Sequence, residues 1–210
     1  MNKNISLFIR KLFFYRIFTL FRDFTQWANR HYAPPSPHFI KKACLIRNSL
    51  PGAIWVETGT YLGETTKFLS RHACKVYSIE PETILFLKAK EYFKSFHHVS
   101  ILHGTSEDTF PKLLPKIKGN VNFWLDGHYS EGITYKGFRD TPIIYELNSI
   151  SKNKKNFKNI AIFIDDIRCF ENNIEEFSSY PSLDYLVKWA QKENFSWHIE
   201  HDIFVAKRLS

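Results

Sequence analysis

The sequence predicts an α/β protein in which helices cover both faces of a mostly parallel sheet. Short apolar runs of strand length alternate with stretches of helix length, a pattern typical of parallel strands joined by crossover helices. The last two apolar runs follow each other almost directly, which predicts a terminal antiparallel hairpin. With 44% hydrophobic and 24% charged residues, the 210-residue chain has the composition of one globular domain with an added element.

Punctuating residues define the order of these elements. Pro51-Gly52 ends the first helix of the domain, Pro111 and Pro115 interrupt another, and Thr141-Pro142 has the chemistry of a helix start. Strands are expected at 53–57, 75–80, 99–103, 121–126, 160–165, 195–200 and 203–207. Helices are expected at 38–50, 63–71, 81–93, 106–117, 142–150 and 183–192.

Residues 1–37 are predicted to be a basic amphipathic helix with a Pro-rich linker, followed by the domain at 38–210. On a helical projection, one side collects Ile9, Phe13, Ile17, Leu20, Phe21, Phe24 and Trp27. Charged residues interrupt the apolar run, which argues against both a transmembrane helix and a signal peptide. Prolines within 32–37 end the helix and mark the linker.

Two roles are open for the apolar side of this helix. In the first, this side packs on the domain or on a second copy of the chain, forming a homodimer. In the second, residues 5–30 lie on the surface of an anionic membrane. The three cysteines, Cys44, Cys74 and Cys169, are far apart and suit a reducing compartment. The expected location is therefore the cytoplasm, with the inner face of a membrane as an alternative.

The basic charge of the chain does not predict nucleic-acid binding. Residues 1–50 contain nine Lys or Arg and one acid, whereas residues 51–210 contain twenty of each sign. Because phosphate contacts require clustered basic residues, the neutral domain is not expected to bind nucleic acid.

Glycines and carboxylates gather where the predicted strands end, the edge at which ligands bind in such sheets. The first strand runs into Glu57-Thr58-Gly59-Thr60-Tyr61-Leu62-Gly63, whose glycines permit a tight turn and close approach to a ligand. Glu80 ends the second strand, where a carboxylate is suited to accept hydrogen bonds from both ribose hydroxyls. The third strand leads to Gly104-Thr105-Ser106-Glu107, a turn and helix start placed to border an adenine. Residues 53–126 are therefore expected to bind a nucleotide-containing cofactor.

The loop from Glu57 to Gly63 resembles the first motif of class I S-adenosylmethionine-dependent methyltransferases. Glu80 matches the ribose-binding acid of that family, and the terminal hairpin matches its antiparallel seventh strand. The resemblance covers about residues 38–208 and implies a Rossmann-like seven-stranded sheet. The cofactor-binding residues that it implies are Glu57, Thr58, Gly59, Thr60, Gly63, Glu80, Ser106 and Asp126.

Three carboxylates are expected at the ends of the fourth and fifth strands. Asp126 ends the fourth strand, and Asp165 and Asp166 end the fifth. Such carboxylates repel one another unless a cation neutralises them, and oxygen ligands favour Mg²⁺, Ca²⁺ or Mn²⁺. The arrangement resembles metal-dependent O-methyltransferases of the catechol and macrocin-like types, which implies that these three residues bind Mg²⁺ or another divalent cation. Alternatively, the acidic pair only caps the following segment, and Arg168 either pairs with the acids or faces the substrate.

His128, two residues after Asp126, is the predicted general base because its ordinary pKa suits proton removal near neutral pH. Catechol-type enzymes have a Lys three positions after the aspartate, where this chain has Tyr129, and that departure favours histidine. Two alternatives remain: His128 is a metal ligand, or it has no role in the site.

The resemblance implies methyl transfer to a hydroxyl oxygen of a small molecule or sugar, with His128 and Asp126 as the catalytic residues. The rivals are a metal-independent small-molecule methyltransferase and a non-catalytic membrane-surface adaptor with a degenerate methyltransferase fold.

Overall fold

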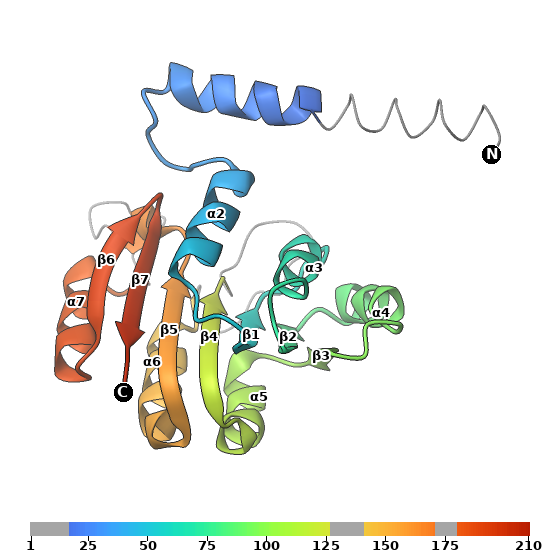
Figure 1. Ribbon diagram of the computed structural model, residues 1–210, viewed down its shortest axis with the longest axis vertical. Coiled ribbons are helices and arrows are strands. Elements are labelled where there is room, and N and C mark those ends of the chain that lie inside the picture. The colour runs from blue at the N-terminus through green and yellow to red at the C-terminus, as the bar shows by residue number, and fades with distance from the viewer. Residues whose placement is uncertain (1–16, 127–140, 171–179) are drawn as a thin grey trace.

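The computed structural model describes residues 17–126, 141–170 and 180–210, which form a sheet of seven strands with helices on both faces (Figure 1). The strand order is β3-β2-β1-β4-β5-β7-β6. The strands are β1 Ile54–Thr58, β2 Lys75–Glu80, β3 Val99–His103, β4 Gly119–Leu125, β5 Phe157–Ile164, β6 Ser196–Glu200 and β7 Ile203–Arg208. Strands β1 to β5 are parallel, and β7 is antiparallel to both β5 and β6, which confirms the predicted fold.

The α-helices follow the predicted order, with small differences at their ends. They are α2 His38–Asn48, α3 Glu64–Leu69, α4 Thr83–Tyr92, α5 Ser106–Leu113, α6 Ile143–Asn153 and α7 Leu183–Lys192. The predicted helix 106–117 divides into α5 and a 3₁₀ turn, Leu114–Lys116, which contains Pro115. Proline lacks the N–H that a continuing helix would use, so the interruption expected at Pro115 is observed. The interruption expected at Pro111 is wrong: Pro111 lies inside α5, and the Glu107 carbonyl that an N–H at position 111 would bond accepts the Tyr145 hydroxyl instead.

Alternating side chains of the strands build two apolar layers. The layer beneath α5, α6 and α7 includes Val56, Phe123, Ile162, Phe110, Leu147 and Leu186. The layer beneath α2 and α3 includes Trp55, Trp124, Phe163, Cys44, Leu45 and Leu69. Because both faces of the central strands are covered, these strands read in the sequence as continuous apolar runs.

The direction of the strand order reverses at β1, which lies between β2 and β4. Thr58, the last residue of β1, pairs with Ile79 of β2 on one side and with Leu125 of β4 on the other. The carboxyl ends of these strands therefore meet at one edge. In open parallel sheets this point of reversal is where ligands bind.

The N-terminal helix, described over residues 17–29, runs outside the layers of the domain and contacts it near its end (Figure 1). Trp27 is 7% exposed and packs edge-on against His201, with 5.8 Å between ring centroids. The remaining apolar side chains are exposed, namely Ile17, Phe18, Leu20, Phe21 and Phe24. Packing against the domain therefore explains the burial of Trp27 but not the other apolar side chains named here. Membrane contact and dimerisation stay predictions.

Residues 5–16 of the predicted membrane segment lie outside the described residues. Within residues 17–126, 141–170 and 180–210, every helix is too short or too polar to cross a lipid bilayer.

Candidate functional site

The loop between β1 and α3 turns tightly at the edge of the sheet, as its glycines predict. Gly59 has a φ of +88° and Gly63 a φ of +76°, both in the left-handed region that favours glycine. The backbone N–H groups of Gly59 and Thr60 donate to the carbonyl oxygen of Ile79, at 3.0 and 3.2 Å. These bonds hold the loop across the end of β2.

Glu57 is fully buried beneath this loop, and its hydrogen-bond donors among the described residues are neutral hydroxyls. Its Oε2 accepts hydrogen bonds from the hydroxyls of Ser78, at 2.6 Å, and Thr66, at 2.5 Å. Its Oε1 has no hydrogen-bond partner among the residues that the structure describes. Burial raises the pKa of Glu57 to about 8, although the two hydroxyls oppose that rise.

Glu80 faces the same loop from the end of β2. Its Oε2 accepts the backbone N–H of Tyr61 at 2.8 Å, and its Oε1 accepts the backbone N–H of Glu82 at 2.9 Å. Burial raises the pKa of Glu80, and the two backbone hydrogen bonds oppose that rise. A carboxylate oxygen can accept a second hydrogen bond, so both oxygens of Glu80 can also receive a ligand hydroxyl.

The turn after β3 completes this part of the edge. The backbone N–H of Gly104 donates to the carbonyl oxygen of Glu80 at 3.1 Å, and Thr105 caps α5 through the N–H of Asp108. Ser106, at the start of α5, is 5% exposed. All eight residues predicted to bind the cofactor thus lie in β1, in its loop, or at the ends of β2, β3 and β4, while their binding role stays a prediction.

Asp126, Asp165 and Asp166 come together at the other part of the edge, and we call them the carboxylate cluster. Leu125 and Ile164 are paired in the register of β4 and β5, so the next residue of each strand leaves the sheet at the same place. One oxygen from each carboxylate lies within 4.8 Å of the others. The predicted proximity is confirmed, and metal binding stays a prediction.

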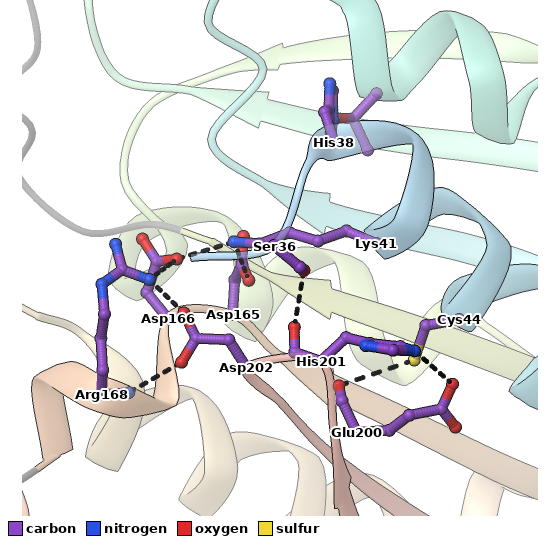
Figure 2. A network of polar contacts seen from close by, with 11 residues as sticks. Ser36, His38, Lys41, Cys44, Asp165, Asp166, Arg168, Glu200, His201 and Asp202 are labelled. Atoms are coloured by element: carbon purple, nitrogen blue, oxygen red, sulfur yellow. Dashed lines mark hydrogen bonds and ion pairs between the residues drawn. The ribbon is translucent and has the colours of Figure 1, made fainter. Parts of the chain in front are cut away.

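Two cations of the same chain contact this cluster (Figure 2). Lys41 Nζ, from α2, lies 2.6 Å from Asp165 Oδ1 and 2.7 Å from Asp166 Oδ1. Arg168 Nη1 lies 2.6 Å from Asp166 Oδ1 and also pairs with the buried Asp202. Of the two roles considered for Arg168, the structure shows pairing with the acids. Burial lowers the pKa of Lys41, but Asp165 and Asp166 raise it by more, which keeps the ammonium charged.

Lys41 is a site residue that sequence analysis missed, although the sequence holds a signal for it. The buried residues of α2 are Lys41, Cys44, Leu45 and Asn48, at the spacing of one helix face. A lysine on a buried face requires an internal acid, because an isolated buried charge is costly. The spacing of the buried residues in α2 shows that Lys41 needs an acidic partner. It does not show that this partner is Asp165, 124 residues further along the chain.

Glu146 of α6 is a second buried acid to which sequence analysis assigned no functional role. It is 1% exposed, and its Oε1 has no hydrogen-bond partner among the described residues. Burial raises the pKa of Glu146 to about 7, against the opposing hydroxyls of Ser106 and Thr58. It contributes to a narrow pocket whose polar lining residues are Asp126, Thr141, Glu146, Asp165 and Tyr180. A carboxyl that titrates near neutrality beside Asp126 is a candidate to bind a substrate group or accept a proton.

His128, the predicted general base, and Tyr129 lie outside the described residues. The structure therefore neither supports nor opposes the predicted role of His128.

Comparison with known proteins gives matches in structure but not in sequence. Neither a protein-family model nor a curated protein matches the chain. Among solved structures, SMU.1697c of Streptococcus mutans, assigned as a methyltransferase and solved with S-adenosylhomocysteine, is similar with a TM-score of 0.52. The chain and this structure share the same fold. At 17% identity, the match covers 83% of this chain and 98% of that one.

Two further structures agree with this fold. YhhF of Escherichia coli, also assigned as a methyltransferase, has a TM-score of 0.50 and 12% identity, over 84% of this chain and 90% of that one. The 23S rRNA methyltransferase ErmE has a TM-score of 0.50 and 10% identity, over 83% of this chain and 68% of that one. At these identities the likeness establishes the fold, and the reaction has to be argued from the site.

Proposed function

We propose that this chain transfers a methyl group from S-adenosylmethionine to a hydroxyl oxygen of a small molecule or sugar. The observation that carries the proposal is the placement of Glu80. Its carboxylate is fixed by the backbone N–H groups of Tyr61 and Glu82 at the point where the strand order reverses. A carboxylate fixed there, beside a glycine loop, is suited to bind the two hydroxyls of a ribose.

The residues of this edge fit a positively charged nucleoside cofactor. S-adenosylmethionine, when bound, would supply a methyl group on a sulfonium, from which a neutral thioether leaves. Among the described residues, Oε1 of Glu57 is a buried hydrogen-bonding atom without a partner, and the carboxylate of Glu80 supplies negative charge. The loop from Glu57 to Gly63, together with Glu80, Ser106 and Asp126, would hold the cofactor.

The acceptor is proposed from family resemblance, and the chain's own residues define what they can do for it. Asp126 and Glu146 line a pocket next to the proposed cofactor edge. His128 follows Asp126 closely in the chain and is the proposed general base. Positioning the acceptor oxygen in line with the methyl carbon would supply much of the rate enhancement.

A divalent cation does not fit the carboxylate cluster in the arrangement observed. Lys41 Nζ already contacts one oxygen of Asp165 and one of Asp166, at 2.6 and 2.7 Å. The Mg²⁺ role of Asp126, Asp165 and Asp166 therefore stays a prediction and is not used in this proposal. The metal-independent methyltransferase is the favoured variant.

Other partners are proposed more coarsely. Nucleic acid is not the proposed acceptor, because the basic excess lies within residues 1–50. A membrane surface or a second copy of the chain is proposed to cover the exposed apolar side chains of the N-terminal helix, which include Phe18 and Phe21. A non-catalytic adaptor is the rival, and it predicts that no cofactor binds.

Titration calorimetry with S-adenosylhomocysteine tests the proposal. Replacing Glu80→Gln removes a charge-assisted hydrogen bond from each of two hydroxyls, so a loss of affinity of about 100-fold is expected. Glu64→Gln is the matched control, because it makes the same charge change on an exposed side chain at the start of α3. Failure of folded wild-type protein to bind S-adenosylhomocysteine would contradict the proposal and favour the adaptor.

A further inference from the structure

The carboxylate cluster contains a built-in positive charge. The Lys41 side chain is 10% exposed, and those of Asp165 and Asp166 are 7% and 13% exposed. Figure 2 shows Lys41 reaching from α2 to both carboxylates, with Arg168 on the opposite side of Asp166. A lysine so deeply buried, with two carboxylates at hydrogen-bond distance, is a structural partner of those carboxylates rather than a surface charge near them.

The position of Lys41 is fixed by contacts that do not involve the cluster. Ser36 Oγ, just before α2, donates to the carbonyl oxygen of His201 at 3.1 Å. Near the other end of the helix, Arg47 and Asn48 both contact the carboxylate of Glu200. The helix that carries Lys41 is thus attached to the β6–β7 hairpin at both ends, which leaves the ammonium little freedom to move away from the acids.

Lys41 and a divalent ion would compete for the same oxygens. Mg²⁺ and Mn²⁺ bind carboxylate oxygens at about 2.0 to 2.2 Å, so an ion shared by Asp165 and Asp166 would lie close to Lys41 Nζ. The ammonium and the ion would then repel each other in a partly desolvated site. An ion that binds through Asp165 Oδ1 and Asp166 Oδ1 therefore requires Lys41 to leave.

We propose that Lys41 is the resident cation of the carboxylate cluster and takes the place of a divalent metal ion. Lys41 acts as a positioning residue: it offsets part of the negative charge of Asp165 and Asp166 and fixes them at the edge where the acceptor would bind. The inference concerns the charge balance of the site, so it does not depend on the proposed methyl transfer.

Mn²⁺ binding tests this inference, measured by the loss of the electron paramagnetic resonance signal of free Mn²⁺, with and without S-adenosylhomocysteine. The variants are Lys41→Met, which removes the ammonium, and Lys42→Met as matched control. Lys42 is the next residue of α2, and its ammonium lies over the ring of Phe68, 5.5 Å from the ring centroid. Wild type and Lys42→Met are expected to show no stoichiometric binding up to about 1 mM Mn²⁺. Lys41→Met is expected to gain a site that binds Mn²⁺ at least about tenfold more tightly than this limit, with a dissociation constant of about 0.1 mM or lower. Adding Asp165→Asn to Lys41→Met should remove the new site.

Two results would overturn the inference. One is stoichiometric Mn²⁺ binding by wild type that Asp165→Asn abolishes, and the other is a folded Lys41→Met that still excludes Mn²⁺. If Lys41→Met does not fold, thermal melting of wild type decides the question. Equal melting temperatures in Mg²⁺ and in EDTA support Lys41 as the cation, and a Mg²⁺-dependent rise that Asp165→Asn removes contradicts it. Because Mn²⁺ binding and S-adenosylhomocysteine binding are separate readouts, this inference and the proposed function fail independently.

Discussion

The two parts of the sheet edge differ in how their acids are satisfied. In the cofactor half, made of Glu57–Gly63, Glu80 and Gly104–Ser106, hydroxyls and backbone N–H groups solvate the carboxylates. The acceptor half consists of the carboxylate cluster with Lys41, Arg168 and Asp202. There the carboxylates form ion pairs with the side chains of Lys41 and Arg168. Among the described residues, no Lys or Arg forms an ion pair with Glu57 or Glu80. The cofactor half therefore leaves the carboxylate of Glu80 without a counter-cation among the described residues, whereas the acceptor half is partly neutralised before any ligand binds.

Glu57 offers the largest expected effect, through the pH dependence of stability. Burial raises the pKa of Glu57 from its ordinary value of 4.5 to about 8 in the folded protein, so its protonated form favours folding. The favourable contribution is complete below about pH 4.5 and is lost as the pH rises to about 8. Glu57→Gln mimics the protonated acid and should remove a slope of up to about 1.4 kcal/mol per pH unit within this window.

Urea denaturation at pH 5 and pH 8 measures this effect. Glu57→Gln is expected to match wild type at pH 5 and exceed its stability at pH 8. The control is Glu64→Gln, whose exposed carboxyl should leave the wild-type pH dependence unchanged. Parallel pH profiles for wild type and Glu57→Gln would show that Glu57 is not a buried protonated acid, and the contrast between the halves would weaken.

The same contrast explains what the sequence could predict. The contacts of the cofactor half are local: Glu80 lies 19 residues from Tyr61, and Glu57 lies 21 residues from Ser78. Strand periodicity and glycine spacing over one β-α-β unit are sufficient to place them.

The acceptor half depends on pairs that no local pattern connects. Lys41 lies 124 residues from Asp165, and Ser36 lies 165 residues from His201. The sequence predicts that Asp126, Asp165 and Asp166 converge, because strand order determines that. It cannot show that a lysine of the first domain helix supplies their counter-charge, since that depends on how α2 packs across the sheet.

Asp202 provides the next largest effect, within the acceptor half. It is 4% exposed, accepts the backbone N–H of Arg168 at 3.0 Å, and pairs with the Arg168 guanidinium. Asn tolerates the positive φ of 68° at this position, so Asp202→Asn tests the charge and not the backbone. We expect a loss of about 3 kcal/mol in the free energy of unfolding, because removing one partner leaves the other incompletely paired.

Chemical denaturation and calorimetry together check this prediction. Asp184→Asn removes an exposed acid that pairs with Lys188 and should cost less than about 0.5 kcal/mol. If the halves are independent, the affinity of Asp202→Asn for S-adenosylhomocysteine stays within about twofold of wild type, since distant sites behave additively. A large loss of affinity in this variant would show that the acceptor half also shapes the cofactor half.

Gly63 tests the opposite half and carries the smallest of these effects on stability. At its φ of +76°, a Cβ would lie 2.8 Å from Cε2 of Phe93, a buried ring at the end of α4. Gly63→Ala therefore adds the cost of a left-handed alanine, about 1 kcal/mol, to the cost of moving a packed ring, for about 2 kcal/mol in total. Gly52→Ala is the matched control: its φ is +62°, but its Cβ would meet nothing within 4 Å, so only the backbone cost of about 1 kcal/mol applies. In thermal denaturation the Gly63 variant should thus melt below the Gly52 variant.

Because the loop of Gly63 also borders the proposed cofactor, the same substitution should weaken S-adenosylhomocysteine binding, whereas Gly52→Ala leaves it unchanged. Equal stability of the two variants would mean that the Phe93 ring moves aside at no cost. Close packing at Gly63 would then not be needed to shape the cofactor half.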